Sequence, residues 1–422
     1  MTRSHHLRNL GPGIVFAAGS IGARDLVANS MAGATYGLGM AWVVVIAIVA
    51  RYVLLDASAR YVLVTGETIL SGCGRIGRWP VMAMFVMALV RRHVSALTKV
   101  LLLGTAAHVV LPLPSPHSVA IWGLVSWCAA IGLLLWGRYR AVEALSRPLA
   151  AVMALSVGLI AVLSRPDIGQ LVSTLIPRSD PASAGSQGPA FVSMAVLAAA
   201  LGSFSNLSYP AYLHEKGWRT TAARSSQRTD LLLGMGLLMT VLLLIQVAAA
   251  GVLLPRGLHV EKVEDLTAMF TEFLGDPGRI LFGVCLWCAS FASTLSNGSG
   301  QGIMLADVYH RFISRRTDAV DLEGKASDLP AYRWSVLFMF CSPLYVFLTD
   351  WTPVGLVLAY GVVSVATLPV MAALILLLTA DRKRMGAHVN TWAINLVLLV
   401  TIICAVQLSW QGLMELVPPT SR

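Results

Sequence analysis

The sequence predicts an all-α polytopic membrane protein with about eleven transmembrane helices. Of its 422 residues, 56% are hydrophobic and only 12% are charged, well below the roughly 25% charged residues of soluble globular proteins. The mean hydropathy is +0.73, and the apolar residues fall in stretches that match the roughly 20 residues of a membrane helix. This composition excludes a soluble enzyme, a disordered chain and a protein with a single membrane anchor.

Eleven apolar segments can be placed along the chain, separated by short polar connections. They lie near residues 12–34, 38–65, 80–111, 118–137, 144–163, 189–213, 230–254, 279–305, 334–349, 353–379 and 390–413. None of the connections is long enough for an extramembrane domain. Residues 1–422 are therefore expected to form a single transmembrane domain.

Basic residues predict the orientation of this domain. They concentrate in alternate connections, above all in 216–228, 311–333 and 382–384, together with the N-terminus. Since positively charged loops stay in the cytoplasm, the N-terminus is predicted to be cytoplasmic and the protein to lie in the inner membrane. A basic cytoplasmic face beside anionic lipid also explains the net charge of +10 without nucleic acid.

Two of the predicted spans carry polar and helix-breaking residues at their centres. The first has Gly22, Arg24 and Asp25 there, and the sixth has Ser205, Asn206 and Ser208, the last followed closely by a proline. Interrupted helices at matching positions of two halves indicate a transporter with its substrate site at mid-membrane. The alternative is that the glycines only permit close helix packing. We therefore expect a first repeat at about 12–163, a second at about 189–379 and an extra helix at about 390–413.

Ionisable side chains inside the spans are the second unusual feature. Charges within a membrane are costly unless they are paired or hydrated. Asp56 and Arg60, four residues apart, are expected to pair on one helix face. The third span has no acid, although it carries four basic residues, Arg91, Arg92, His93 and Lys99. Either water reaches these groups or acids of other helices face them, and His93 is a candidate proton carrier or a packing residue.

Several motifs, in order and at compatible spacing, resemble the Nramp family of divalent metal transporters. They are Gly11-Pro12-Gly13, Ala32-Gly33-Ala34-Thr35-Tyr36-Gly37, Ser58-Ala59-Arg60 with Val64-Thr65-Gly66, Phe291 to Gly298 with Gly300-Gln301-Gly302, and Leu368-Pro369. The resemblance implies a leucine-transporter-type inverted repeat, with five helices in each half and one further helix. It also implies uptake of a cation driven by a proton or ion gradient. The sequence has no metal-ligand, nucleophile or phosphate-loop signature, so neither enzyme chemistry nor a cofactor is expected.

The residues that carry the family's chemistry differ here. The Asp-Pro-Gly-Asn motif of the first family helix falls on Gly22, Ala23, Arg24 and Asp25, so the ligand aspartate is replaced and the asparagine position holds an acid. The Met-Pro-His motif of the sixth helix has no counterpart. Its methionine position is Asn206 or Leu207, and its histidine position is Ser208 or Tyr209. The acidic pair of the third helix is also missing.

The leading hypothesis is a secondary transporter that moves a divalent cation by alternating access. Asp25 and Asn206 would be the metal ligands, completed by oxygen atoms near Gly22, Ser205 and Ser208, and oxygen donors favour hard ions such as Mn or Mg. The candidates for gating or coupling are Arg24, Arg91, Arg92, His93 and Lys99. The expected partners are the lipid bilayer and a small inorganic ion, with no obligatory protein partner. Two alternatives remain: an anionic or amino-acid-like substrate attracted by Arg24 and the basic third span, and a non-transporting sensor.

Overall fold

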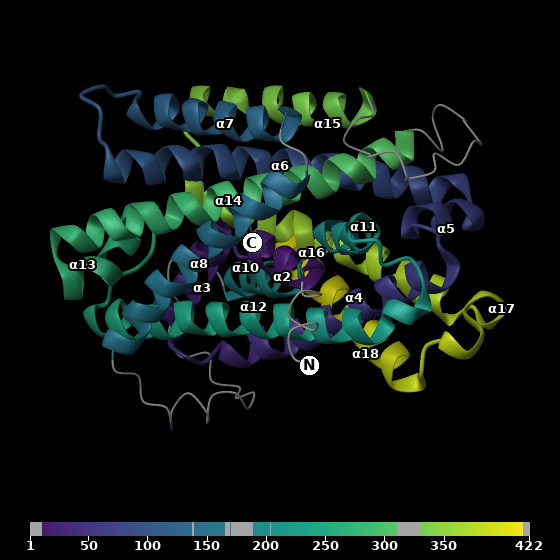
Figure 1. Ribbon diagram of the computed structural model, residues 1–422. Coiled ribbons are helices and arrows are strands. Elements are labelled where there is room, and N and C mark those ends of the chain that lie inside the picture. The colour runs from purple at the N-terminus through teal and green to yellow at the C-terminus, as the bar shows by residue number, and fades with distance from the viewer. Residues whose placement is uncertain are drawn as a thin grey trace, which may run out of the picture.

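The computed structural model describes residues 11–136, 139–164, 169, 189–202, 204–309 and 330–416. In this part of the chain all regular secondary structure is helical (Figure 1). The long helices are α4 (Ala41–Thr65), α6 (Arg78–Val110), α7 (Ser118–Trp136), α8 (Tyr139–Leu163), α12 (Arg224–Val252), α14 (Asp276–Val308), α15 (Pro330–Cys341), α16 (Pro353–Ala380) and α18 (Trp392–Leu416). Shorter helices connect them, namely α5 (Ile69–Ile76), α13 (Ala268–Leu274) and α17 (Arg382–Met385).

These helices follow the predicted spans closely. Within the described residues, nine helical segments are long and apolar enough to cross a membrane. The total of eleven spans stays a prediction, because the first span is divided into two short helices and α8 has only a shorter apolar portion.

The first and sixth spans are interrupted, as the sequence predicts. The first consists of α2 (Pro12–Ser20) and α3 (Ala23–Tyr36), separated by Ile21 and Gly22. The sixth consists of α10 (Pro189–Leu201), a 3-10 turn η1 (Phe204–Leu207) and α11 (Ser208–Glu215). Gly202 at this second break has a φ of +67°, which a residue with a side chain rarely adopts.

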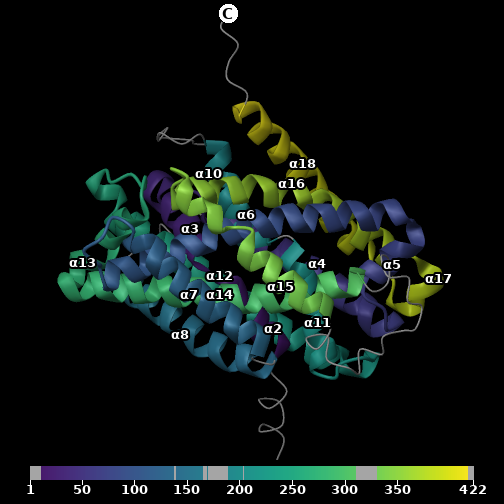
Figure 2. The same cartoon turned by 90° about the horizontal axis from the view of Figure 1, so that it is seen from above.

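The two breaks lie at the centre of the bundle. In Figure 1, α2, α3 and α10 lie between α6 and α14 on one side and α12 on the other. Each broken span packs against a helix of the other half of the chain: α2 and α3 contact α12, whereas α10 and α11 contact α4. Likewise α6 contacts α16, whereas α14 contacts α8. Figure 2 shows the same bundle from above, with α10 beside α16.

The N-terminal end of α2 is fixed against α12. The Asp230 carboxylate accepts hydrogen bonds from the backbone N–H groups of Gly11 and Gly13, at 3.0 and 2.5 Å. A Cβ atom on Gly13 would lie 2.4 Å from the Asp230 carbonyl oxygen, and one on Gly234 would lie 2.4 Å from the Gly13 carbonyl oxygen. Glycine is therefore required on both helices at this crossing, which sets the position of the first broken span.

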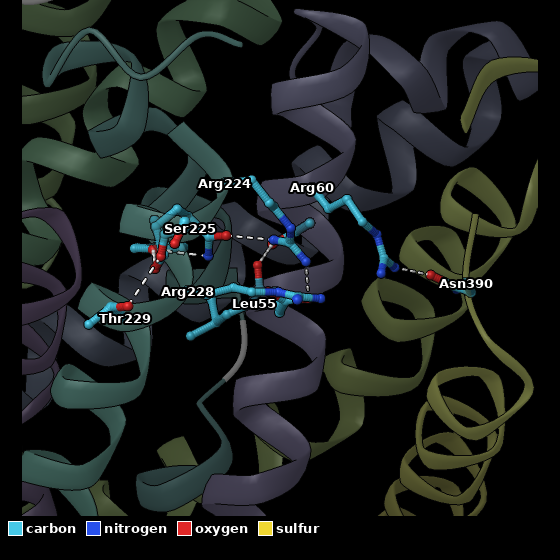
Figure 3. A network of polar contacts seen from close by, with 11 residues as sticks. Leu55, Arg60, Arg224, Ser225, Arg228, Thr229 and Asn390 are labelled. Carbon is cyan, nitrogen blue, oxygen red and sulfur yellow. Dashed lines mark hydrogen bonds and ion pairs between the residues drawn. The ribbon is translucent and has the colours of Figure 1, made fainter. Parts of the chain in front are cut away.

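A charged network lies at one end of the bundle, where α4, α12 and the start of α18 meet (Figure 3). The predicted pair of Asp56 with Arg60 is not formed. Asp56 pairs instead with Arg224 at 2.6 Å and with Arg228 at 3.7 Å. Arg60 instead donates to the side-chain oxygen of Asn390. The reason is that α12 and the segment before α18 pack against this part of α4 and supply the partners. The local sequence of α4 does not show which elements lie beside it.

Candidate functional site

Asp25 lies in the first turn of α3, directly after the break. Its Oδ2 atom accepts a hydrogen bond from the Gly22 N–H at 2.7 Å, so the carboxylate caps the N-terminal end of its own half-helix. The side chain of Asn29 donates to the Asp25 carbonyl oxygen at 2.8 Å and accepts from Gln246 of α12 at 3.1 Å. Asp25 is buried. The helix break thus creates a site where a carboxylate is held at mid-bundle.

Arg51 of α4 connects the two breaks. Its guanidinium group donates from Nη2 to Ser20 Oγ at 2.9 Å, from Nη1 to the Ala200 carbonyl at 3.2 Å and from Nε to Asn206 Oδ1 at 3.0 Å. Ser20 ends α2 and Ala200 lies in the last turn of α10, where exposed carbonyl groups attract a cation. Arg51 was not among the predicted site residues. Its signal in the sequence is an arginine in the middle of an apolar span, with no acid within four residues of it.

A polar face of α14 lies against the first break. Asn297 donates to the Gly19 carbonyl at 3.3 Å and to Ser293 Oγ at 3.1 Å, and Tyr212 donates to the Ser296 carbonyl at 2.8 Å. A Cβ atom on Gly19 would lie 1.9 Å from Ser296 Oγ, so α2 touches α14 directly. Ser293, Ser296 and Asn297 belong to the family-like motif of this span, but they were not predicted for the site.

Two of the basic residues, Arg24 and Arg91, meet at the ring of Tyr360 in α16, and Lys99 lies near both of them and near Asp25. Arg24 stacks over this ring, with its Cζ atom 3.6 Å from the centroid. Arg91 donates from Nη1 to the Tyr360 hydroxyl at 2.5 Å, and Lys99 donates to the Ser293 carbonyl at 2.8 Å. The Lys99 ammonium group lies within electrostatic reach of both arginines and of Asp25. Tyr360 was not predicted for the site, and no local pattern marks it.

Arg92 and His93 point to other neighbours. Arg92 donates to Met339 Sδ in α15 at 3.4 Å. The His93 ring stacks on Tyr345, with centroids 5.6 Å apart, and its Nε2 atom lies 2.9 Å from the Tyr345 hydroxyl. Tyr345 belongs to the 3-10 turn η7 (Leu344–Leu348), which follows α15. The five gating candidates are therefore divided: Arg24 and Arg91 meet at Tyr360 with Lys99 within electrostatic reach of both, whereas Arg92 and His93 contact the α15 side.

Protein donors already engage two of the predicted ligand residues, Asp25 and Asn206. Asn206 Oδ1 accepts from Arg51, and Arg51 also lies within electrostatic reach of Asp25. Ser208 is buried and faces Gly300 of α14, and Ser205 is half-buried in η1. Among the described residues, no group of three or more His, Cys, Asp or Glu side chains is placed to hold a metal ion. Any metal site here needs amide, hydroxyl or carbonyl oxygens besides one carboxylate.

Comparison with known proteins agrees with this architecture. The natural resistance-associated macrophage protein-like (Nramp) family profile matches residues 13–415. The divalent metal cation transporter MntH of Deinococcus radiodurans is 24% identical, over 96% of this chain and 89% of that protein. The uncharacterized protein PM0681 of Pasteurella multocida is 28% identical over a shorter stretch, and the match spans 33% of this chain and 31% of that relative's length.

A solved structure shows the same fold. The Eremococcus coleocola manganese transporter superposes with a TM-score of 0.76 at 17% identity, covering 96% of this chain and 85% of that one. This likeness confirms the predicted fold class, an all-helical polytopic protein of the leucine-transporter type. Because the family profile covers nearly the whole sequence, the chain belongs to the Nramp family.

Proposed function

We propose that this protein is a secondary transporter that moves a divalent metal cation, a hard ion such as Mn or Mg, by alternating access. The carrying observation is the pair of helix breaks that meet at the centre of the bundle, with Asp25 at one break and Asn206 at the other. Family membership supports the proposal, since the MntH relative is named a divalent metal cation transporter and not an enzyme.

The cation would bind between Asp25 and Asn206. The oxygen atoms near Gly22, Ser205 and Ser208 would complete its shell, and oxygen ligands suit hard cations. Arg51 now donates to Asn206 Oδ1 at 3.0 Å, and a cation at that oxygen repels the guanidinium group. Loading therefore requires Arg51 to leave Asn206, which would loosen its bonds to the ends of α2 and α10. This competition would couple cation binding to movement of the two broken spans.

The remaining features of the proposal come from the sequence. The N-terminus would face the cytoplasm and the protein would lie in the inner membrane, with residues 12–163 and 189–379 as the two repeats and 390–413 as an extra helix. The basic side chains Arg24, Arg91, Arg92, Lys99 and His93 would act in gating or coupling. The ion is substrate, and neither a cofactor nor a protein partner is part of the mechanism.

The test is uptake of Mn²⁺ and Mg²⁺ into proteoliposomes that hold the purified full chain, with and without a pH gradient. Asp25→Asn keeps the shape of the side chain and removes its charge, so uptake should fall at least about 10-fold. Asp350→Asn, in an exposed connection, is the matched control and should transport normally. Folded wild-type protein that takes up neither ion would contradict the proposal.

A second candidate function is transport of an anionic or amino-acid-like substrate. The observation in its favour is the charge around Asp25, where Arg24, Arg51 and Lys99 all lie within electrostatic reach of one carboxylate. Arg24→Gly separates the two candidates in the same vesicles. The substitution should increase uptake of a divalent cation by removing a repulsive charge, whereas it should abolish uptake of an anion.

A further inference from the structure

Buried arginine atoms without partners are the basis of a further inference. Among the described residues, no hydrogen-bond partner is found for Nη1 of Arg24, for Nε and Nη2 of Arg91, or for Nε and Nη1 of Arg92. Arg91 is 1% exposed and Arg92 is 2% exposed. An uncompensated charge away from water is among the costliest groups a protein can bury. Something besides the described side chains is expected to satisfy these donors.

The geometry of Arg91 indicates what that partner is. Nη1 is used by the Tyr360 hydroxyl, which leaves Nε and Nη2, the two donors on the same edge of the guanidinium group. This edge binds the two oxygen atoms of a planar anion in a bidentate manner. No described residue hydrogen-bonds to this edge, and a planar oxyanion has the two acceptor atoms that would pair with it.

The surroundings of this edge are strongly positive. Arg24 is held over the Tyr360 ring and has its own unpartnered Nη1 atom. The Lys99 ammonium group lies within electrostatic reach of Arg24, Arg91 and Arg92. Of the described carboxylates, only Asp25 acts on Lys99, and it already accepts the Gly22 N–H. One carboxylate does not neutralise these four cations, and an anion would lower the cost of burying them.

We propose that Arg24, Arg91 and Lys99, together with Tyr360, form a binding site for a small, planar, monovalent oxyanion. Arg91 binds it with the Nε and Nη2 edge, Arg24 with Nη1, and Lys99 attracts it as a point charge. The site joins α3, α6 and α16 beside the helix break. This site goes beyond cation transport, because anion binding here depends on these basic residues and not on the identity of the transported substrate.

The experiment measures anion binding directly. Purified full-length protein in gluconate buffer is titrated with sodium nitrate or sodium chloride at constant ionic strength, and the thermal unfolding midpoint is followed. A ligand that binds only the folded state raises this midpoint in a saturable manner. Nitrate, which is planar, should saturate at a lower concentration than chloride, which cannot use both donors of the Arg91 edge.

Variants assign the effect to the site. Arg91→Gln and, independently, Arg24→Gln should each weaken nitrate binding at least 10-fold, whereas Arg75→Gln, an exposed arginine paired with Glu67, should bind like the wild type. Two variants are used so that poor recovery of one leaves the other as a test. A midpoint that follows only ionic strength, or equal responses of the wild type and both site variants, would overturn the proposal. Chloride binding as tight as nitrate would overturn the assignment to an oxyanion.

This result is independent of the cation test. If metal uptake fails but saturable nitrate binding is lost in Arg91→Gln, the anion site stands and the proposed substrate falls. If metal uptake depends on Asp25 but nitrate has no saturable effect, the anion site falls and the transport proposal stands.

Discussion

Two groups of arginines in this protein differ in how their positive charges are compensated. At one end of the bundle, Arg224 and Arg228 face Asp56, and Arg60 donates to Asn390 (Figure 3). At the centre, Arg91 and Arg92 are more deeply buried, yet their described neighbours include a tyrosine hydroxyl and a methionine sulfur. Among the described residues, the first group has an acid at its core, and the second makes no ion pair with one.

The difference teaches that burial alone does not define the role of a charged residue in a membrane bundle. The end network acts as a structural clamp, because its ion pairs join α4 to α12. Removal of its acid would leave the basic side chains to repel each other. The central cluster contributes positive potential to the region of the helix breaks at a cost in stability. Stability measurements on one variant from each group are therefore expected to change in opposite directions.

The largest expected effect comes from removing the acid of the end network. Asp56→Ala leaves Arg224 and Arg228 without their carboxylate, and the side chains of Asp56 and Arg224 are only 7% and 14% exposed. Breaking such a pair should lower the free energy of unfolding by about 3 kcal/mol. Chemical denaturation in detergent micelles measures this change, with Asp350→Ala as an exposed control that should stay close to the wild type. An unchanged stability of Asp56→Ala would show that the network is not a clamp.

A smaller effect of opposite sign is expected at the centre. Arg92→Met replaces a buried guanidinium group that contacts Met339 Sδ by an apolar side chain of similar length. In gluconate buffer, without a small anion, this should raise the free energy of unfolding by about 1 kcal/mol, because an uncompensated charge is removed. The same denaturation assay applies. A loss of stability would mean that Arg92 has a partner that compensates its charge, and the contrast between the two groups would disappear.

Much of the fold could be predicted from local patterns. The ends of α4, α12 and α16 agree with the apolar segments within a few residues, except that α12 begins earlier, because hydropathy depends only on neighbouring residues. The break at Gly22 and the break near Asn206 were also predicted, since glycine and polar residues in an apolar span disfavour a continuous helix. Gly22 and Asp25 lie within one turn, so their proximity follows from the local sequence, and the Gly22 N–H donates to the Asp25 carboxylate.

The composition of the site could not be predicted in the same way. Arg51 meets Asn206 across 155 positions of sequence, and Arg91 meets Tyr360 across 269. No local pattern states which of several buried arginines faces a helix end, a tyrosine or an acid. The predicted pairing of Asp56 with Arg60 was wrong for the same reason, because α12 presents Arg224 and Arg228 to Asp56.

The sequence by itself determined the helical membrane architecture, the family and the positions of the two helix breaks, because each follows from residues that are neighbours along the chain. Only the tertiary structure decided that Arg51 joins the two breaks and that Arg24 and Arg91 meet at Tyr360. The physical reason is that a buried charge takes its partner from whichever helices pack against it, and this packing is fixed by contacts between distant residues such as Gly13 and Gly234.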